Sequence, residues 1–222
     1  AKKTVFDTEI FNPAIKRLAD LSGKEYGGDS AVTCAMRIIA DHLRTAVFIL
    51  GDDKQIVPSN VDQGYILRRL IRRAVRQARR LHAESALVPI AEDYIKEYQE
   101  QYPELRRNQA RILDELHKEQ EKFTETLEVG LKELDRLVRI GEIGQISNGE
   151  EAKILNRVSA EKAFYIFQTF GFPLEMIQEE LAPRCLVVDE VEFQKEFAKH
   201  QKLSRSGAAQ KFTGGLADHS VP

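Results

Sequence analysis

The sequence predicts a mainly α-helical protein, an irregular helical bundle with one long helical hairpin. Apolar residues recur at spacings of three and four through most of the 222 residues, which is the period of an α-helix. Charged residues make up 31% of the chain, as is typical of helices with one solvated face. Hydrophobic residues make up 42%, which is enough to build a core beneath those faces.

Two helices are predicted in the first 50 residues. Residues 7–21 carry an apolar side at helical spacing, and Ser22-Gly23 ends this helix. Residues 31–50 form the second helix, whose apolar stripe is again at helical spacing. Pro58 then excludes a continuous helix, because proline restricts the residue before it to extended conformations.

The third predicted helix, which ends near Leu81, carries two opposite stripes. Ser59, with Asp62 three residues later, is predicted to cap its start. At about 100° per residue, the apolar side chains and the arginines fall on opposite sides of the helix. The apolar stripe is Leu67, Leu70, Ile71, Ala74, Ala78 and Leu81, and the opposite stripe is Arg69, Arg72, Arg73, Arg76 and Arg80. One face can therefore be buried while the other presents guanidinium groups.

A hairpin of helices is predicted over residues 83–140. Residues 85–102 form a helix broken near Pro89, and a long helix runs from Pro103 to about Ile140. This long helix carries a heptad-like seam formed by Leu116, Gln120, Phe123, Leu127, Gly130, Leu134 and Leu137. We interpret the seam as the packing face of an antiparallel hairpin. A dimeric coiled coil is the alternative.

The remaining chain is predicted to be a loop, three helices and a tail. Residues 141–158 contain three glycines and two asparagines and are expected to form a loop. Ser159 is expected to cap a helix that ends at Gly171, and Asp189 to cap the last helix. The predicted organisation is a first helical part (1–82), the hairpin (83–140), a second helical part (141–203) and a linker (204–222).

Positive charge is concentrated in one region, although the net charge is −2. Residues 37–80 hold ten Lys or Arg and four Asp or Glu, and residues 68–80 hold seven Arg with no acid. Like charges at this helical spacing repel each other. Such a stripe therefore favours contact with an extended anion, of which a nucleic-acid backbone is the commonest. A solvated face with scattered salt bridges, or contact with an acidic protein, is the alternative.

Other kinds of site find little support in the residues. The five histidines are scattered, and the Gly-rich phosphate loops are absent, so no metal or nucleotide cofactor is expected in this chain. His42, next to Asp41, is interpreted as structural. Cys34 and Cys185 are interpreted as buried thiols of a reducing compartment, and no stretch is apolar enough to span a membrane. A cytoplasmic protein is expected.

Several motifs, in order, carry a resemblance to a known family. They are Phe6–Phe11 (FDTEIF), Arg37–Arg44 (RIIADHLR), Pro58–Asn60 (PSN), Gly64–Arg76 (GYILRRLIRRAVR), Thr169–Pro173 (TFGFP) and Gly214–Ser220 (GGLADHS). In these motifs the chain resembles the alanyl-tRNA synthetases, over nearly its whole length. The resemblance implies the middle, tRNA-recognising part of such an enzyme.

The resemblance also implies which partners the chain binds and which activities it lacks by itself. The expected partners are the acceptor stem of alanine tRNA and the adjacent aminoacylation and editing domains of a longer protein. ATP, Mg and Zn are expected only in those domains, so this chain should not activate alanine by itself. The alternative is a helical protein-interaction or dimerisation module that uses the seam of residues 103–140.

Two positions of the family motifs are implied to read a G·U wobble pair in the acceptor stem. One is Asn60, whose alternative role is to cap the helix. The other position carries Asp in the family and Gln168 here, so discrimination at that base pair is expected to shift or relax. The phosphate contacts are expected from Arg69, Arg72, Arg73, Arg76 and Arg80, with Arg37 and Arg44 as neighbours. Some of these arginines are expected to pair with the protein's own acids instead.

Overall fold

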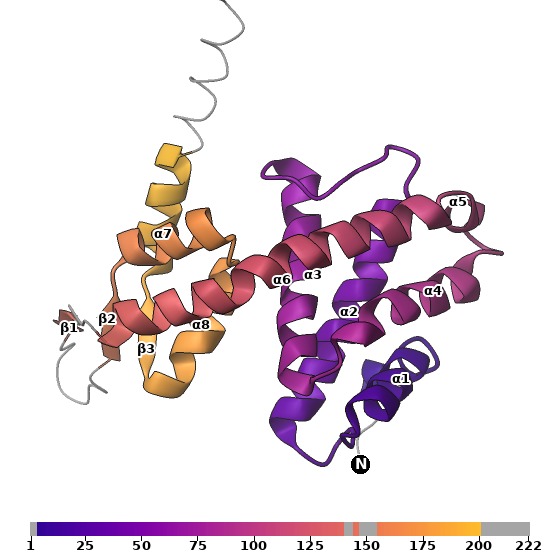
Figure 1. Ribbon diagram of the computed structural model, residues 1–222, viewed down its shortest axis with the longest axis horizontal. Coiled ribbons are helices and arrows are strands. Elements are labelled where there is room, and N and C mark those ends of the chain that lie inside the picture. The colour runs from indigo at the N-terminus through magenta and orange to yellow at the C-terminus, as the bar shows by residue number, and fades with distance from the viewer. Residues whose placement is uncertain (1–3, 140–143, 147–154, 201–222) are drawn as a thin grey trace, which may run out of the picture. The chain divides into compact units, whose positions relative to one another are not determined.

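The structure, a computed structural model, describes residues 4–139, 144–146 and 155–200, and it confirms the mainly helical class (Figure 1). The chain divides into two compact units, Ala1–Val129 and Gly130–Pro222, which we call unit 1 and unit 2. This boundary falls inside the predicted 83–140 segment because one helix continues through it. The four-part organisation stays a prediction.

Unit 1 is built from helices. They are α1 (Asn12–Ser22), α2 (Ser30–Gly51), α3 (Asp62–Leu81), α4 (Leu87–Tyr98), α5 (Pro103–Arg107) and the first part of α6 (Gln109–Arg139), with 3-10 turns at Val5–Asp7 and Glu84–Ala86. Helices α2 and α3 share the most extensive packing, and α4 also packs on α2. Figure 1 shows the chain reversing at α5, so that α6 runs back in the direction opposite to α4.

Three helix boundaries differ from the prediction. Helix α1 begins at Asn12, because residues 5–7 form a separate turn held by reciprocal bonds between Thr4 and Asp7. Pro89 does not break α4, since it lies in the first turn, where a backbone N–H has no helical partner. The predicted helix from Pro103 is interrupted at Asn108, whose side chain donates to the Gly51 carbonyl at 2.8 Å.

The core of unit 1 is formed by the apolar stripes of its helices. The largest fully buried side chains here are Leu18, Met36, Ile39, Leu43, Leu50, Leu67, Ile71, Leu87, Ile90 and Phe123. The seam of α6 contributes Leu116, Phe123 and Leu127, all of which are buried within this chain. Burial of a Leu, Ile or Phe side chain is worth about 1.5–3 kcal/mol, so the seam stabilises the folded chain itself.

Unit 2 contains a small sheet that the sequence did not predict. Its strands are β1 (Gly144–Ile146), β2 (Leu155–Val158) and β3 (Leu186–Val188), in the order β1-β2-β3. Strands β1 and β2 are antiparallel, whereas β2 and β3 are parallel, with Arg157 opposite Val187. The predicted loop over 141–158 is therefore wrong where the chain is described. Residues 140–143, 147–154 and the predicted linker at 204–222 lie outside the described residues.

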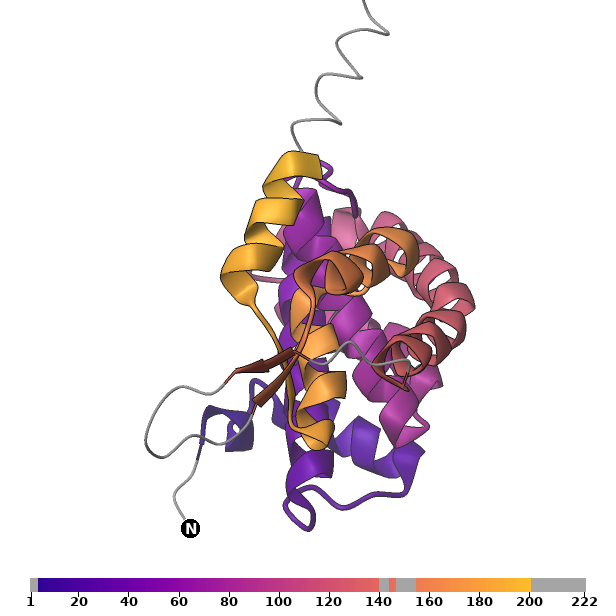
Figure 2. The same ribbon diagram turned by 90° about the vertical axis from the view of Figure 1, so that its left-hand side faces the viewer.

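Two helices of unit 2 begin at their predicted caps, and α7 also ends at its predicted glycine. They are α7 (Ala160–Phe170), α8 (Leu174–Leu181) and a helix over 190–200, with a 3-10 turn at Ala182–Arg184. The Ser159 side chain accepts from the Lys162 backbone N–H, Asp189 accepts from that of Glu192, and Gly171 ends α7 with a φ of 70°. An aromatic cluster joins α7 to the helix over 190–200, and Figure 2 shows these two helices side by side in orange and yellow.

One seam position requires glycine. A Cβ atom at Gly130 would lie closer than 3.0 Å to the ring of Phe172, which is fully buried in unit 2. Glycine therefore lets α6 and the end of α7, with Phe172 two residues beyond it, approach each other closely.

The prediction that both cysteines are buried is wrong. Cys34 and Cys185 are both exposed. Cys34 is next to the buried pair Ala35 and Met36 but falls outside the apolar stripe of α2. Cys185 ends a 3-10 turn with a φ of 55°, one residue before β3.

Candidate nucleic-acid interface

Helix α3 buries one side, as predicted. Leu67, Ile71, Ala74, Ala78 and Leu81 are all 2% exposed or less. Of the arginines on this helix, Arg72 is buried, and Arg79 and Arg80 near its C-terminus are the most exposed. The helix is therefore anchored by its apolar stripe, and its other side is available to carry charge.

The start of α3 differs from the predicted cap. The helix begins at Asp62, which has a φ of 50°, and the residue before it is Val61 rather than Ser59. The Ser59 hydroxyl instead donates to the Val61 carbonyl at 3.0 Å, and the Ser59 backbone N–H donates to the carbonyl of Gly64 at 3.0 Å. A Cβ atom at Gly64 would come closer than 3.0 Å to Ser59, so glycine permits this folded loop.

The loop over residues 57–61 presents Asn60 at the surface. Asn60 is exposed, and its side-chain oxygen accepts a hydrogen bond from Nη1 of Arg68. Nη2 of the same guanidinium donates to the Pro58 carbonyl at 3.2 Å. The structure shows no helix-capping bond from Asn60 in the region described, so its alternative role as a cap is not supported.

Arg72 lies in a buried ion pair. Its Nε is 2.6 Å from Oε1 of Glu119 on α6, and the two residues are 6% and 5% exposed. The guanidinium also lies over the ring of Phe123, with 5.0 Å from Cζ to the ring centroid. We therefore assign Arg72 a structural role in joining α3 to α6, as expected for some members of the row.

Arg68 is a residue that the sequence reasoning missed. Its Nε lies 3.6 Å from the same Glu119 oxygen, and its side chain is 18% exposed. Burial lowers the pKa of Arg68, an effect that the charge of Glu119 opposes. Its position one residue after Leu67 and three before Ile71 puts it at the edge of the buried stripe, which is the signal that could have found it.

The other predicted arginines of α3 are more accessible. Arg69, Arg73 and Arg76 are half-buried and also interact within the chain, whereas Arg80 is exposed. Arg79, which was not predicted as a contact, pairs with Glu84 at 3.2 Å and with Glu128. We call Arg69, Arg73, Arg76 and Arg80, the predicted arginines of α3 that are not buried, the arginine face.

Arg37 and Arg44 lie on α2 among aromatic rings. Arg37 donates to the Tyr26 hydroxyl at 2.8 Å and lies over the rings of Phe6 and Tyr26. Arg44 lies in the same way over Phe48 and Tyr98. Their guanidinium planes are thus held by stacking, which leaves part of each charge exposed.

The second predicted base-pair reader lies in the other unit. Gln168 is exposed on α7, three residues before Gly171. Asn60 belongs to unit 1 and Gln168 to unit 2, so their joint action on one base pair stays a prediction.

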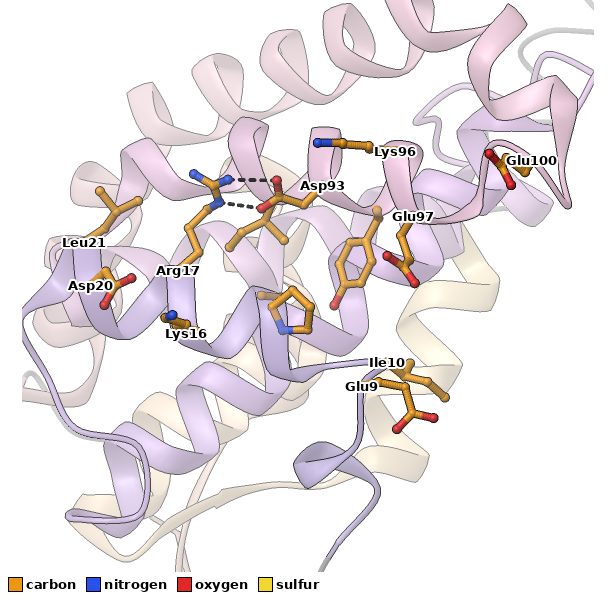
Figure 3. A pocket seen from close by; sticks show the side chains of 14 residues that line it. Glu9, Ile10, Lys16, Arg17, Asp20, Leu21, Asp93, Lys96, Glu97 and Glu100 are labelled. Carbon is orange, nitrogen blue, oxygen red and sulfur yellow. Dashed lines mark hydrogen bonds and ion pairs between the residues drawn. The ribbon is translucent and has the colours of Figure 1, made fainter.

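A cleft of about 740 Å³ lies between α1 and α4, and no predicted site residue lines it (Figure 3). Arg17 and Asp93 meet inside it in a two-point pair, with Nε–Oδ2 and Nη2–Oδ1 distances of 2.5 and 2.8 Å. Five carboxylates and three cationic side chains line the cleft, so its charge does not favour a phosphate ligand. No sequence motif indicated it.

Neither a metal site nor a membrane span is found in the described ranges. Within them, no three His, Cys, Asp or Glu side chains are grouped so that they could hold a metal ion. No helix there is both long and apolar enough to cross a membrane. His42 is buried, with Nδ1 at 3.0 Å from the Asp41 carboxylate, in agreement with a structural role.

An anchored helix with an arginine face, next to an exposed amide, is an arrangement typical of nucleic-acid interfaces. The family model described as "tRNA synthetases class II (A)" matches residues 1–220, and the chain belongs to this family. The match covers the described parts of both units.

The comparisons narrow the family further. The chain is 43% identical over 221 residues to an alanine–tRNA ligase of Treponema pallidum, 41% over 220 residues to that of Treponema denticola, and 37% over 218 residues to that of Borrelia hermsii. These matches cover 98–99% of the chain but 35% of each relative. The chain is thus homologous to alanine–tRNA ligases and spans about one third of the length of these relatives. This confirms the resemblance found in the motifs.

Proposed function

We propose that this chain is the tRNA-recognition part of an alanine–tRNA ligase and binds the acceptor stem of alanine tRNA. The observation that supports this most is the placement of the exposed Asn60 at the start of the helix that carries the arginine face. Guanidinium groups bind phosphates and fix the register of the nucleic acid, while an amide can read a base edge.

The contribution to catalysis is positioning. The arginine face holds the stem, and Asn60 and Gln168 read the G·U pair, so that the terminal ribose reaches a neighbouring aminoacylation domain. The chemistry with ATP and Mg²⁺, and the Zn²⁺ of editing, belong to other parts of the ligase in this proposal. The described residues offer no donor set that fits a metal ion. A cytoplasmic location follows from the same proposal.

The structure supports the alternative function less well. A dimerisation module would need the seam of α6 to be available to a second copy. Leu116, Phe123 and Leu127 are instead buried within their own chain. A protein-interaction module could still use the arginine face to bind an acidic protein, and an experiment must test this possibility.

A competition experiment tests the proposal. A labelled RNA hairpin with the acceptor-stem sequence of alanine tRNA is bound to the chain and followed by fluorescence anisotropy. We expect unlabelled hairpin to displace it, and expect poly-glutamate of equal charge to be a much weaker competitor. Equal displacement by poly-glutamate, or no binding of the hairpin, would contradict the proposal.

The role of Gln168 is a finer part of the proposal. An Asp at this position can only accept, which suits the exocyclic amine of guanine. The amide of Gln168 both donates and accepts and carries no charge. We therefore propose that this chain discriminates less strongly for guanine at the wobble pair than an Asp-bearing relative does.

A further inference from the structure

We propose that Arg68 is a positioning residue that fixes the Asn60 amide so that it reads the base pair only as a hydrogen-bond donor. This inference rests on the proposed function and adds to it the chemical form in which Asn60 meets the RNA. It also gives a role to an arginine that lies outside the arginine face.

The identity of the bonded atoms follows from chemistry. Nη1 of Arg68 contacts the end of the Asn60 side chain. A guanidinium has donors and no acceptor, so the atom it holds must be the amide oxygen. The –NH₂ group of Asn60 is then left for a ligand, because the residue is exposed. Without Arg68, the amide could turn and offer either its oxygen or its nitrogen.

Arg68 grips the loop at two points. Besides Asn60, it donates through Nη2 to the Pro58 carbonyl at 3.2 Å. Two bonds from one planar group fix the direction of the loop as well as the side chain that it presents. The guanidinium is therefore placed to orient Asn60 before any RNA arrives, which lowers the cost of ordering it on binding.

The guanidinium of Arg68 also lies close to a buried carboxylate on α6. Glu119 on α6 is buried, pairs with Arg72 at 2.6 Å and has an oxygen 3.6 Å from Nε of Arg68. Glu119 is the acid shared by Arg72 and Arg68, and these three residues and Asn60 all lie in unit 1. The orientation of Asn60 is thus tied to the rigid packing of α3 and α6.

An Asn60 amide that can only donate a hydrogen bond should prefer one base pair over another. On the major-groove edge of the pair, uracil presents a carbonyl oxygen, O4, where cytosine presents an exocyclic amine, so this proposal has Asn60 read that edge while Gln168 reads the guanine amine on the opposite, minor-groove edge. A donor-only Asn60 therefore favours G·U over G·C, since an N–H group cannot bond an amine that also donates. A freely turning amide would accept from the cytosine amine and lose this preference.

A double-mutant cycle tests the inference. Dissociation constants of the chain are measured for two acceptor-stem hairpins that differ only in a G·U or a G·C third pair. We expect Arg68→Met to reduce the G·U preference by roughly 5- to 150-fold, the range for one base contact. We expect the same change to have no further effect in an Asn60→Ala background, because Arg68 acts through Asn60.

Two controls separate orientation from charge and from folding. Arg80→Met removes the same charge from the same helix and should weaken binding to both hairpins equally. Arg68→Lys keeps the charge and one possible donor, and should restore part of the preference. If Arg68→Met fails to give the helical circular dichroism of the wild type, Arg68→Lys decides the outcome.

The possible results distinguish the two proposals. A wild-type chain that binds neither hairpin contradicts the proposed function. A wild-type chain that prefers G·U, and keeps this preference in Arg68→Met, overturns only the inference about Arg68. The inference would also be overturned if Arg68→Met lowered the affinity for both hairpins equally and this loss added to the loss of Asn60→Ala in the double variant. Arg68 would then act by binding a phosphate.

Discussion

The buried pair between Arg72 and Glu119 gives the sharpest stability prediction. Glu119→Leu leaves the guanidinium of Arg72, which is 6% exposed, without its carboxylate partner at 2.6 Å. Removing one partner of a buried pair typically costs about 3–5 kcal/mol, because an uncompensated charge stays buried. The stacking of Arg72 on Phe123 does not replace the missing carboxylate. We therefore expect a loss of about 3 kcal/mol or more in the opening free energy of α3 and α6.

Hydrogen exchange measured by mass spectrometry is the suitable assay, because it reports on each helix separately. The predicted loss corresponds to amide exchange roughly 100-fold or more faster in peptides of α3 and of α6 up to Val129. Peptides of α7 and α8, in unit 2, serve as the internal reference.

Two matched variants accompany this measurement. Glu128→Gln removes the acid of the exposed pair with Arg79 and should change the opening free energy by about 1 kcal/mol or less. The double change Arg72→Leu with Glu119→Leu should recover part of the loss, since the buried charge of Arg72 is removed together with its partner, while the less buried Arg68 keeps its bonds to Asn60 and Pro58. The role of the buried pair is refuted if Glu119→Leu exchanges no faster than Glu128→Gln, or if the double change is as unstable as the single one.

Three further predictions concern the loop, the acid stability and the base pair. Gly64→Ala should displace the loop at Ser59, since the added Cβ has no room there. The affinity for the hairpin should therefore fall, while the helical circular dichroism stays close to that of the wild type. Hydrogen bonds from Arg107 and Asn108 hold the pKa of Asp53 below its ordinary value, so this stabilisation is present above about pH 4 and lost as the pH falls through the lowered pKa. The thermal midpoint should therefore fall less between pH 5 and 2 in Asp53→Asn, and an equal fall would contradict the assignment. Gln168→Asp should strengthen the preference for a G·U hairpin over an inosine·U hairpin, which lacks the amine, and an unchanged ratio would count against the proposed role.

Local signals in the sequence were sufficient for most of the helices. The stripe of α2 repeats with the helical period, and the helix begins and ends within one residue of the prediction. Ser159 and Gly171 bound α7 because capping and left-handed termination depend on neighbouring residues only. The apolar side of α3 followed from the same period.

The errors depend on contacts between distant residues. Strand β2 forms because Asn156 to Val158 pair with Leu186 to Val188, about 30 residues later, and the turn-like composition of this stretch gave no sign of it. The break at Asn108 depends on the carbonyl of Gly51, at the end of another helix. Neither contact has a local signature.

The same limit applies to the candidate site. Spacing put Arg72 among the outward arginines, yet Glu119, 47 residues away, draws it into a buried pair. Spacing also gave no sign of the role of Arg68, because its bond to Asn60 depends on how the loop after Pro58 folds back. The sequence could predict which helix carries the charge, but only the packing shows which arginines it leaves outside.

The salt dependence of hairpin binding tests the central claim most directly. We predict that affinity falls steeply as salt rises. Replacing Arg69, Arg73, Arg76 or Arg80 by Met should lower the slope of log K against log salt by about one for each phosphate that is no longer neutralised. A slope that is the same in wild type and in all four variants would contradict the claim that the arginine face of α3 holds the RNA backbone.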